Sequence, residues 1–117
     1  MSRFIRWQGI ASFFVVMALI IVFVYLFADS LVKKGYEFLV TIGQIKTPKL
    51  REYLFNQLEK YHAKIATIIS PRAYISKHAQ IDKGSIIMHD VLINADAHIG
   101  KNCIINTKAL IEHDAII

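Results

Sequence analysis

The chain has 117 residues, a formal net charge of +5 and 55% hydrophobic residues, which is enough for one modest domain and excludes a complete two-domain enzyme. Its one cysteine, Cys103, excludes an intramolecular disulfide and argues against a cysteine-based zinc site. The basic excess lies beside an apolar stretch, which suits membrane phosphates as a partner. No block of lysine and arginine with interleaved aromatic residues occurs in the sequence, which argues against nucleic acid as a partner.

The first predicted element is an apolar segment, residues 9–28, which carries no charged side chain. At 1.5 Å rise per residue this length spans roughly 30 Å, the thickness of the hydrocarbon core of a bilayer. Trp7 and Tyr25 lie near its ends, where amphipathic rings favour the interface. The segment therefore predicts a transmembrane helix in contact with membrane lipid. A cleaved signal peptide is the alternative, but the apolar region is too long and Leu26-Phe27-Ala28 is a poor cleavage site.

The flanks of this segment leave its orientation open. Basic residues on the N-terminal side favour a cytoplasmic N-terminus, whereas Lys33 and Lys34 favour the opposite orientation. Residues 1–35 are thus predicted to be a single-pass anchor with its flanks, in a membrane such as the bacterial inner membrane.

Residues 36–70 are predicted to form a strand, a helix and a second strand. The β-rich run 38–42 indicates a short buried strand, and Thr47-Pro48 gives a helix start with Thr47 as the N-cap. A second strand is predicted over residues 65–69, before Ser70-Pro71. This is one βαβ unit, a partial Rossmann-like segment without a glycine-rich phosphate loop. The predicted apolar face of the helix is Leu50, Tyr53, Leu54, Leu58 and Tyr61.

From residue 69 onward an isoleucine recurs at every sixth position. A period of six fits neither a helix nor a flat strand, but it fits a triangular coil of 18 residues with one isoleucine inside each side. Residues 71–117 are therefore predicted to form a hexapeptide-repeat parallel β-helix, with small side chains near the corners; Cys103 is then a packing residue. The isoleucines stand at 69, 75, 81, 87, 93, 99, 105, 111 and 117.

The last residues, up to Ile117, begin a new side of the coil, and no polar or helical cap follows. An uncapped stack exposes an apolar cross-section and open strand edges. The sequence therefore predicts an incomplete β-helix, in which the chain is a fragment or another subunit covers that end.

Two segments carry a family resemblance: residues 99–114, with the pattern Asn106-Thr107 followed by Glu112-His113-Asp114, and residues 68–76. On these, residues from about 36 to 117 resemble the NeuD-type sugar O-acyltransferases, the sialic acid O-acetyltransferase family, which is close to the UDP-amino-sugar N-acetyltransferases. The resemblance implies a left-handed β-helix, a homotrimer, acetyl-CoA as the acyl donor, and a sugar or nucleotide sugar as acceptor. Because acetyl-CoA is cytosolic, an active enzyme also needs its catalytic part in the cytoplasm.

The same resemblance assigns roles to three residues. His113 matches the general base that takes a proton from the acceptor hydroxyl or amine, and Asp114 matches the acidic residue that orients it. Asn106 matches a residue lining that pocket. The chain departs from the family because the opening strand, the glycine-rich loop and the later coils are missing, and residues 1–35 look unrelated to it.

The spacing of the histidines bears on the metal question. Side chains stack on one edge of the coil only when they are multiples of 18 residues apart, and His78, His89, His98 and His113 never align. This argues against a histidine metal site within one chain. Two functions therefore compete: an acyl-CoA-dependent sugar acetyltransferase with direct, histidine-assisted transfer, and a catalytically inactive, membrane-tethered β-helix fragment.

Overall fold

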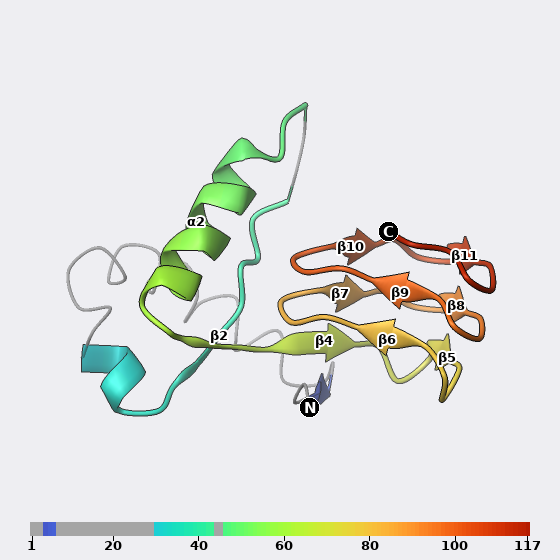
Figure 1. The fold of residues 1–117 in the computed structure, drawn as a ribbon, viewed down its shortest axis with the longest axis horizontal. Coiled ribbons are helices and arrows are strands. Elements are labelled where there is room, and N and C mark those ends of the chain that lie inside the picture. Colours follow the sequence, from blue (N-terminus) through green and yellow to red (C-terminus); the bar gives the residue numbers. More distant parts are fainter. Residues whose placement is uncertain (1–3, 7–29, 44–45) are drawn as a thin grey trace. The chain divides into compact units, whose positions relative to one another are not determined.

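The computed structural model describes residues 4–6, 30–43 and 46–117. The chain divides into two units, one made of residues 8–65 and the other of residues 1–7 together with residues 66–117. Figure 1 shows the elements of both units coloured along the sequence.

The first unit contains the predicted strand, helix and strand. After a helical segment at residues 30–33, the order is β2 (Glu37–Phe38), α2 (Lys49–Lys60) and β3 (Lys64–Ile65). Strands β2 and β3 pair in parallel, with Phe38 opposite Ile65, so the predicted βαβ connection is confirmed. Its buried core consists of Phe38, Val40, Leu54, Phe55, Leu58, Ala63 and Ile65.

The predicted strand over residues 38–42 is wrong beyond Phe38. The Arg51 side chain, only 1% exposed, donates from Nη1 to the carbonyl oxygens of Val40 at 2.6 Å and Ile42 at 3.1 Å. These oxygens are the groups that a neighbouring strand would otherwise bind. Because a buried side chain satisfies them, the segment stays buried without forming a longer ladder.

The apolar face predicted for α2 is also partly wrong. Leu50 is 55% and Tyr53 is 43% exposed, whereas the buried residues are Arg51, Leu54, Phe55 and Leu58. The buried stripe has the expected helical spacing, but an arginine occupies its first position, which a count of apolar residues misses. The helix starts at Lys49, whose amide donates to Thr47 Oγ1 at 3.3 Å, with Pro48 at the N-cap position.

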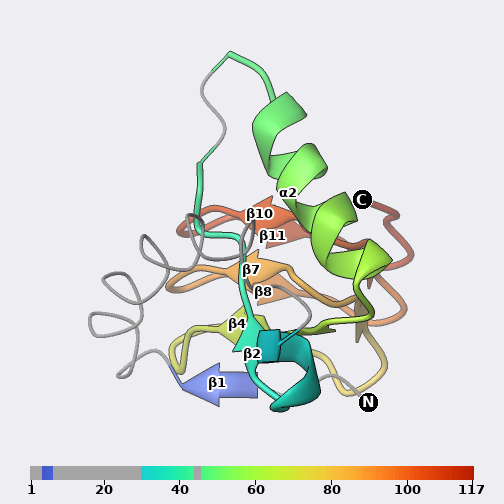
Figure 2. The same cartoon turned by 90° about the vertical axis from the view of Figure 1, so that its left-hand side faces the viewer.

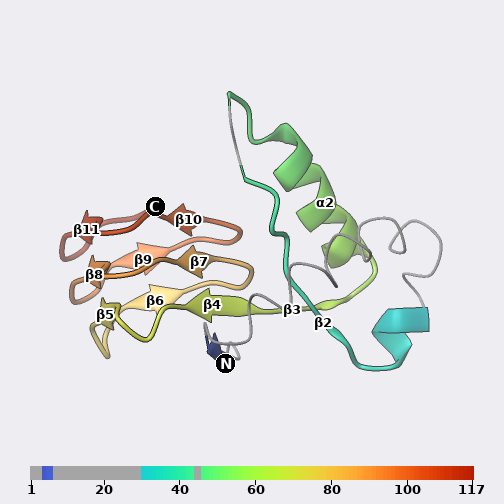
Figure 3. The same ribbon diagram turned by 180° about the vertical axis from the view of Figure 1, so that it is seen from behind.

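The second unit is a parallel β-helix whose strands repeat every 18 residues. Ile86 lies opposite Ile104, Leu92 opposite Leu110, and Gln80 opposite His98. Three sheets result, ordered β1-β4-β7-β10, β11-β8-β5 and β6-β9, and they are visible as stacked rungs in Figures 2 and 3. The strands are β4 (Thr67–Ile69), β5 (Tyr74–Ile75), β6 (Gln80–Ile81), β7 (Ile86–Ile87), β8 (Leu92–Ile93), β9 (His98–Ile99), β10 (Ile104–Ile105) and β11 (Leu110–Ile111).

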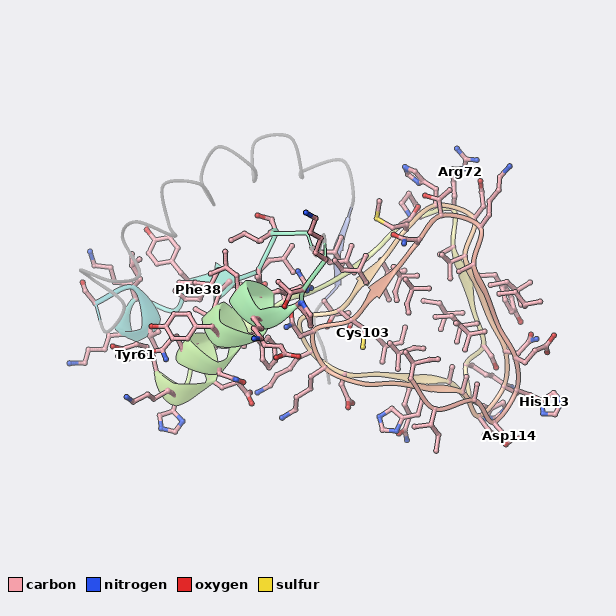
Figure 4. All side chains as sticks on the ribbon, turned by 90° about the horizontal axis from the view of Figure 1, so that it is seen from above. Phe38, Tyr61, Arg72, Cys103, His113 and Asp114 are labelled. Atoms are coloured by element: carbon pink, nitrogen blue, oxygen red, sulfur yellow. The ribbon has the colours of Figure 1, made fainter. Side chains whose placement is uncertain are left out.

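Seen along the stack, each coil is a triangle with side chains pointing into it (Figure 4). Ile87, Ile93 and Ile99 are fully buried in this core, and Cys103 packs against it, as predicted. Ile117 is 53% exposed and departs from the prediction that every isoleucine of the series is inside. These parallel sheets and their 18-residue register fit the predicted left-handed β-helix.

The β-helix begins earlier than the predicted boundary at residue 71. Strand β4 pairs with β7, so that Ile69 lies opposite Ile87, and β4 is therefore the first side of the first coil. The predicted strand over residues 65–69 is consequently two strands, because Ile65 pairs with β2 in the other unit.

The corners of the triangle are two-residue turns, and the second residue of most of them has a positive φ. Aspartate, asparagine and glycine tolerate this left-handed conformation better than other residues, which explains their six-residue spacing here. The six corner residues with a positive φ are Gly84, Asp90, Asp96, Asn102, Lys108 and Asp114. We call residues 83–84 and 101–102 the first corner, 71–72, 89–90 and 107–108 the second, and 77–78, 95–96 and 113–114 the third.

The N-terminal strand β1 (Phe4–Arg6) adds to the lower edge of the β-helix, pairing in parallel with β4, as Figure 2 shows. The predicted membrane span, residues 9–28, lies outside the described residues, and none of the helices described is long and apolar enough to cross a membrane. A single span over residues 9–28 would place β1 and β4 on opposite sides of the membrane. The β1–β4 pairing and that span therefore exclude each other.

Candidate active site

His113 and Asp114 form an acid–base pair at the third corner, directly after β11 (Figure 4). Nδ1 of His113 lies 2.8 Å from Oδ2 of Asp114, and the two side chains are 74% and 72% exposed. The turn positions them: Asp114 has φ 61°, and its amide donates to the carbonyl oxygen of Ala95 on the coil below at 3.1 Å. The backbone of this pair is thus anchored to the stack while both side chains face solvent.

The neighbouring carboxylates make the imidazole more basic. The hydrogen bond to Asp114 raises the pKa of His113 above 6.5, and the charges of Asp114 and Glu112 raise the pKa further. A carboxylate can only accept a hydrogen bond, so neutral His113 places its proton on Nδ1. Its Nε2 lone pair is then available to accept a proton from a bound molecule, which is the arrangement that a general base needs.

Glu112 directly precedes this corner, and the resemblance assigned it no role although it is part of the family pattern. Its Oε2 accepts a hydrogen bond from Nδ2 of Asn94 at 3.1 Å. These two residues are 18 positions apart and therefore stack on adjacent coils. The 18-residue spacing, applied to all polar residues and not only to histidines, would have paired them.

Asn106, the third predicted site residue, is not brought to this corner. It directly precedes the second corner, whereas His113 lies at the third, with the whole β11 side between them. Its carbonyl oxygen accepts a hydrogen bond from Ala109 across its own turn at 3.1 Å, and its side chain is exposed. Within one chain, Asn106 and His113 therefore do not line a common pocket.

Two other histidines have polar partners elsewhere on the β-helix. Nδ1 of His89 lies 2.6 Å from Oγ of Ser70, which is buried. Nε2 of His98 lies 3.1 Å from Oδ2 of Asp82. In residues 30–43 and 46–117, no three histidine, cysteine or acidic side chains are grouped so that they could hold a metal ion. His113 differs from His89 and His98 in that its polar partner, Asp114, is the next residue of the same turn.

No protein-family model matches the chain, but solved structures do. The chain is similar to the N-acetyltransferase PerB from Caulobacter crescentus in complex with CoA and GDP-perosamine, at 31% identity and a TM-score of 0.67, over 75% of this chain and 42% of that one. Two variants of the same enzyme, with one histidine replaced by asparagine or by alanine, match at 30% identity, TM-score 0.67 and 75% of this chain, covering 41% of their own length.

These neighbours are sugar N-acetyltransferases, so the predicted resemblance to sugar acyltransferases is confirmed at that level. This chain spans about two fifths of the length of the structures that it matches. The match supports the β-helical fold and gives acyl transfer to a sugar as a hypothesis for the reaction. The predicted anchor in residues 1–35 has no counterpart in these findings.

Proposed function

We propose that this chain carries the acid–base corner of an acyl-CoA-dependent acetyltransferase that acts on an amino sugar, in particular one attached to a nucleotide. The observation that carries the proposal is the 31% identical match to an enzyme whose structure holds CoA and GDP-perosamine. The exposed His113–Asp114 pair, at 2.8 Å, supplies the chemistry that such a transfer needs. Acetyl-CoA is here a substrate, the acyl donor.

In the proposed reaction His113 acts as a general base. The acceptor amine attacks the thioester carbonyl carbon, a C–N bond forms, the C–S bond breaks, and Nε2 takes the proton that the nitrogen loses. The protonated imidazole then returns that proton to the departing CoA sulfur, so no covalent enzyme intermediate is needed. Asp114 keeps the other ring nitrogen protonated and stabilises the positive charge that develops on the ring.

The amine is favoured over a hydroxyl as the acceptor group because the similar structures are of a perosamine N-acetyltransferase. We further propose that the working form is a homotrimer without a catalytic metal, in which Asn106 lines the substrate pocket.

The proposal is tested by acetyl-CoA turnover with the purified full chain and nucleotide-linked amino sugars. Replacement His113→Asn should lower the rate about 10²–10⁴-fold, the usual contribution of a positioned general base. The matched control is His78→Asn, because His78 lies at the same corner two coils below and is exposed. Equal rates in both variants, or no CoA release by the unmodified chain with any such acceptor, would contradict the proposal.

The membrane anchor over residues 9–28 stays a prediction. A chain anchored by this segment should stay in the membrane pellet after carbonate extraction, because its backbone amides are satisfied only as a helix in the bilayer. Full-length protein in the supernatant would contradict the anchor and agree with the β1–β4 pairing.

A further inference from the structure

The β-helix has an open lower end, where its first coil, residues 67–84, begins. The inward isoleucines of the second coil are fully buried, whereas those of the first coil are half-buried. The two sets are Ile87, Ile93 and Ile99, above Ile69, Ile75 and Ile81. Strands β5 and β6 are also the last strands of their sheets in the described part of the chain. Apolar side chains and unpaired strand edges at the end of a repeat stack favour pairing with another chain.

Strand β1 covers one of the three strand edges at this end. It has the same length as β4 and pairs with it along all three residues, so that Ile5 lies opposite Ile68 and Arg6 opposite Ile69. Ile68 in turn lies opposite Ile86 of β7. Strand β1 thus takes the place of one more rung of the first sheet, although it is far from β4 in the sequence (Figure 2).

Arg6 stands at a register position that isoleucine has in every higher strand of this sheet. The residue opposite it is Ile69, above which Ile87 and Ile105 follow in the core. A further coil below β1 would have to bury the positive charge of Arg6, which costs free energy unless the charge is paired. Natural sheets protect their edges with charges at inward positions in the same way. The register therefore places the end of the apolar core at β1.

We propose that β1 is an end cap of the β-helix, which keeps its lower end from associating with the lower end of a second copy. In such a pair, a two-fold axis perpendicular to the coils brings the two β4 edges together as antiparallel neighbours, and the half-buried isoleucines of the two first coils face each other. With β1 in place the β4 edge is already paired, and an arginine stands in line with the core column. No residue of the third corner takes part, so this inference does not rest on the proposed function.

Hydrogen exchange of single amides tests whether β1 covers the edge of β4. The amide of Ile68 donates to the carbonyl oxygen of Ser85 in the coil above at 3.0 Å. Because successive amides of a parallel strand point to opposite neighbours, the amide of Ile69 points to β1. Replacement Ile5→Pro introduces a residue that lacks an amide hydrogen and fits poorly inside a paired strand. Exchange at Ile69 should therefore become at least tenfold faster, while exchange at Ile68 stays unchanged.

This comparison is made at a dilution at which the variant does not associate. Equal exchange at Ile69 in the unmodified chain and in Ile5→Pro would show that β1 is not docked and would overturn the proposal. At higher concentration, exchange at Ile69 in the variant should slow again, because the β4 edge of a second copy then covers it. Exchange that stays fast at every concentration would also overturn the proposal, since the freed edge would then attract no second copy.

Sedimentation velocity of the full chain in a mild non-ionic detergent tests the capping role of Arg6. Arg6→Ile puts an isoleucine in line with the core column, so no charge has to be buried, and the association constant should rise at least tenfold over that of the unmodified chain. The matched control is Arg3→Ile, which makes the same change of charge and size outside β1 and should leave association unchanged. If Arg6→Ile associates no more strongly than Arg3→Ile, then β1 is not a cap and the proposal is wrong.

Discussion

Truncation of Ile93 is the sharpest test of the β-helical core. Its side chain is 0% exposed and lies at the centre of the buried cluster, stacked between Ile75 and Ile111 of the adjacent coils. Ile93→Ala removes three buried carbon atoms, each worth about 0.8 kcal/mol of transfer free energy. The cavity that remains adds to this, so the expected loss in free energy of unfolding is about 3–4 kcal/mol.

The matched series is Ile93→Val and Ile117→Ala. The valine variant removes one carbon atom and should cost about 1 kcal/mol. Ile117 is 53% exposed and its truncation leaves no enclosed cavity, so the loss should be under about 1 kcal/mol. Urea unfolding followed by far-UV circular dichroism measures all three. If Ile93→Ala costs no more than Ile117→Ala, then the isoleucines do not fill a common core and the triangular coil is wrong.

Three further predictions concern single residues. Gly84→Ala should cost about 1–2 kcal/mol in urea unfolding because Gly84 has φ 81°, where a Cβ is strained; no change would mean that the corner adapts. Asp114→Asn keeps a residue that tolerates positive φ but removes the charge that raises the pKa of His113. Because a general base works unprotonated, the acid limb of the pH–rate profile should move to lower pH. If the acid limb does not move, His113 is not the general base. Arg51→Met removes the donor from the buried carbonyl oxygen of Val40 and the half-buried one of Ile42 and should cost about 1–3 kcal/mol. Thermal unfolding measures this loss against Lys49→Met on the exposed face of the same helix.

The inside of the β-helix could be predicted from the sequence because one residue type repeats there with one period. The isoleucine series gave the 18-residue register that the strand pairs confirm. The start of the first coil could not be located from the sequence. The strand that begins at Thr67 precedes Pro71, and its sequence fits the end of a Rossmann-like segment as well as the first side of a β-helix. The role of Arg51 could not be predicted either, because only the structure shows that its guanidinium donates to the carbonyl oxygens that a neighbouring strand would otherwise bind.

The candidate site could be predicted only in part, for a geometric reason. His113 and Asp114 are adjacent in sequence and share one turn, so their contact follows from the turn itself. Asn106 is also close to His113 in sequence, but one whole side of the β-helix lies between them, so the two residues are at different corners. The contact between Asn94 and Glu112 shows the converse, since residues far apart in sequence meet when they differ by one coil.

The corner turns impose a rule on how this chain tolerates insertions and deletions. One extra residue in a side would shift every later isoleucine out of the core and every later corner away from its residue of positive φ. Eighteen extra residues would leave each side chain facing as before and lengthen the stack by one rung. The molecule is therefore fragile toward small length changes and permissive toward whole coils, so gain or loss of complete coils is the route by which such a chain can change length without losing its third-corner histidine.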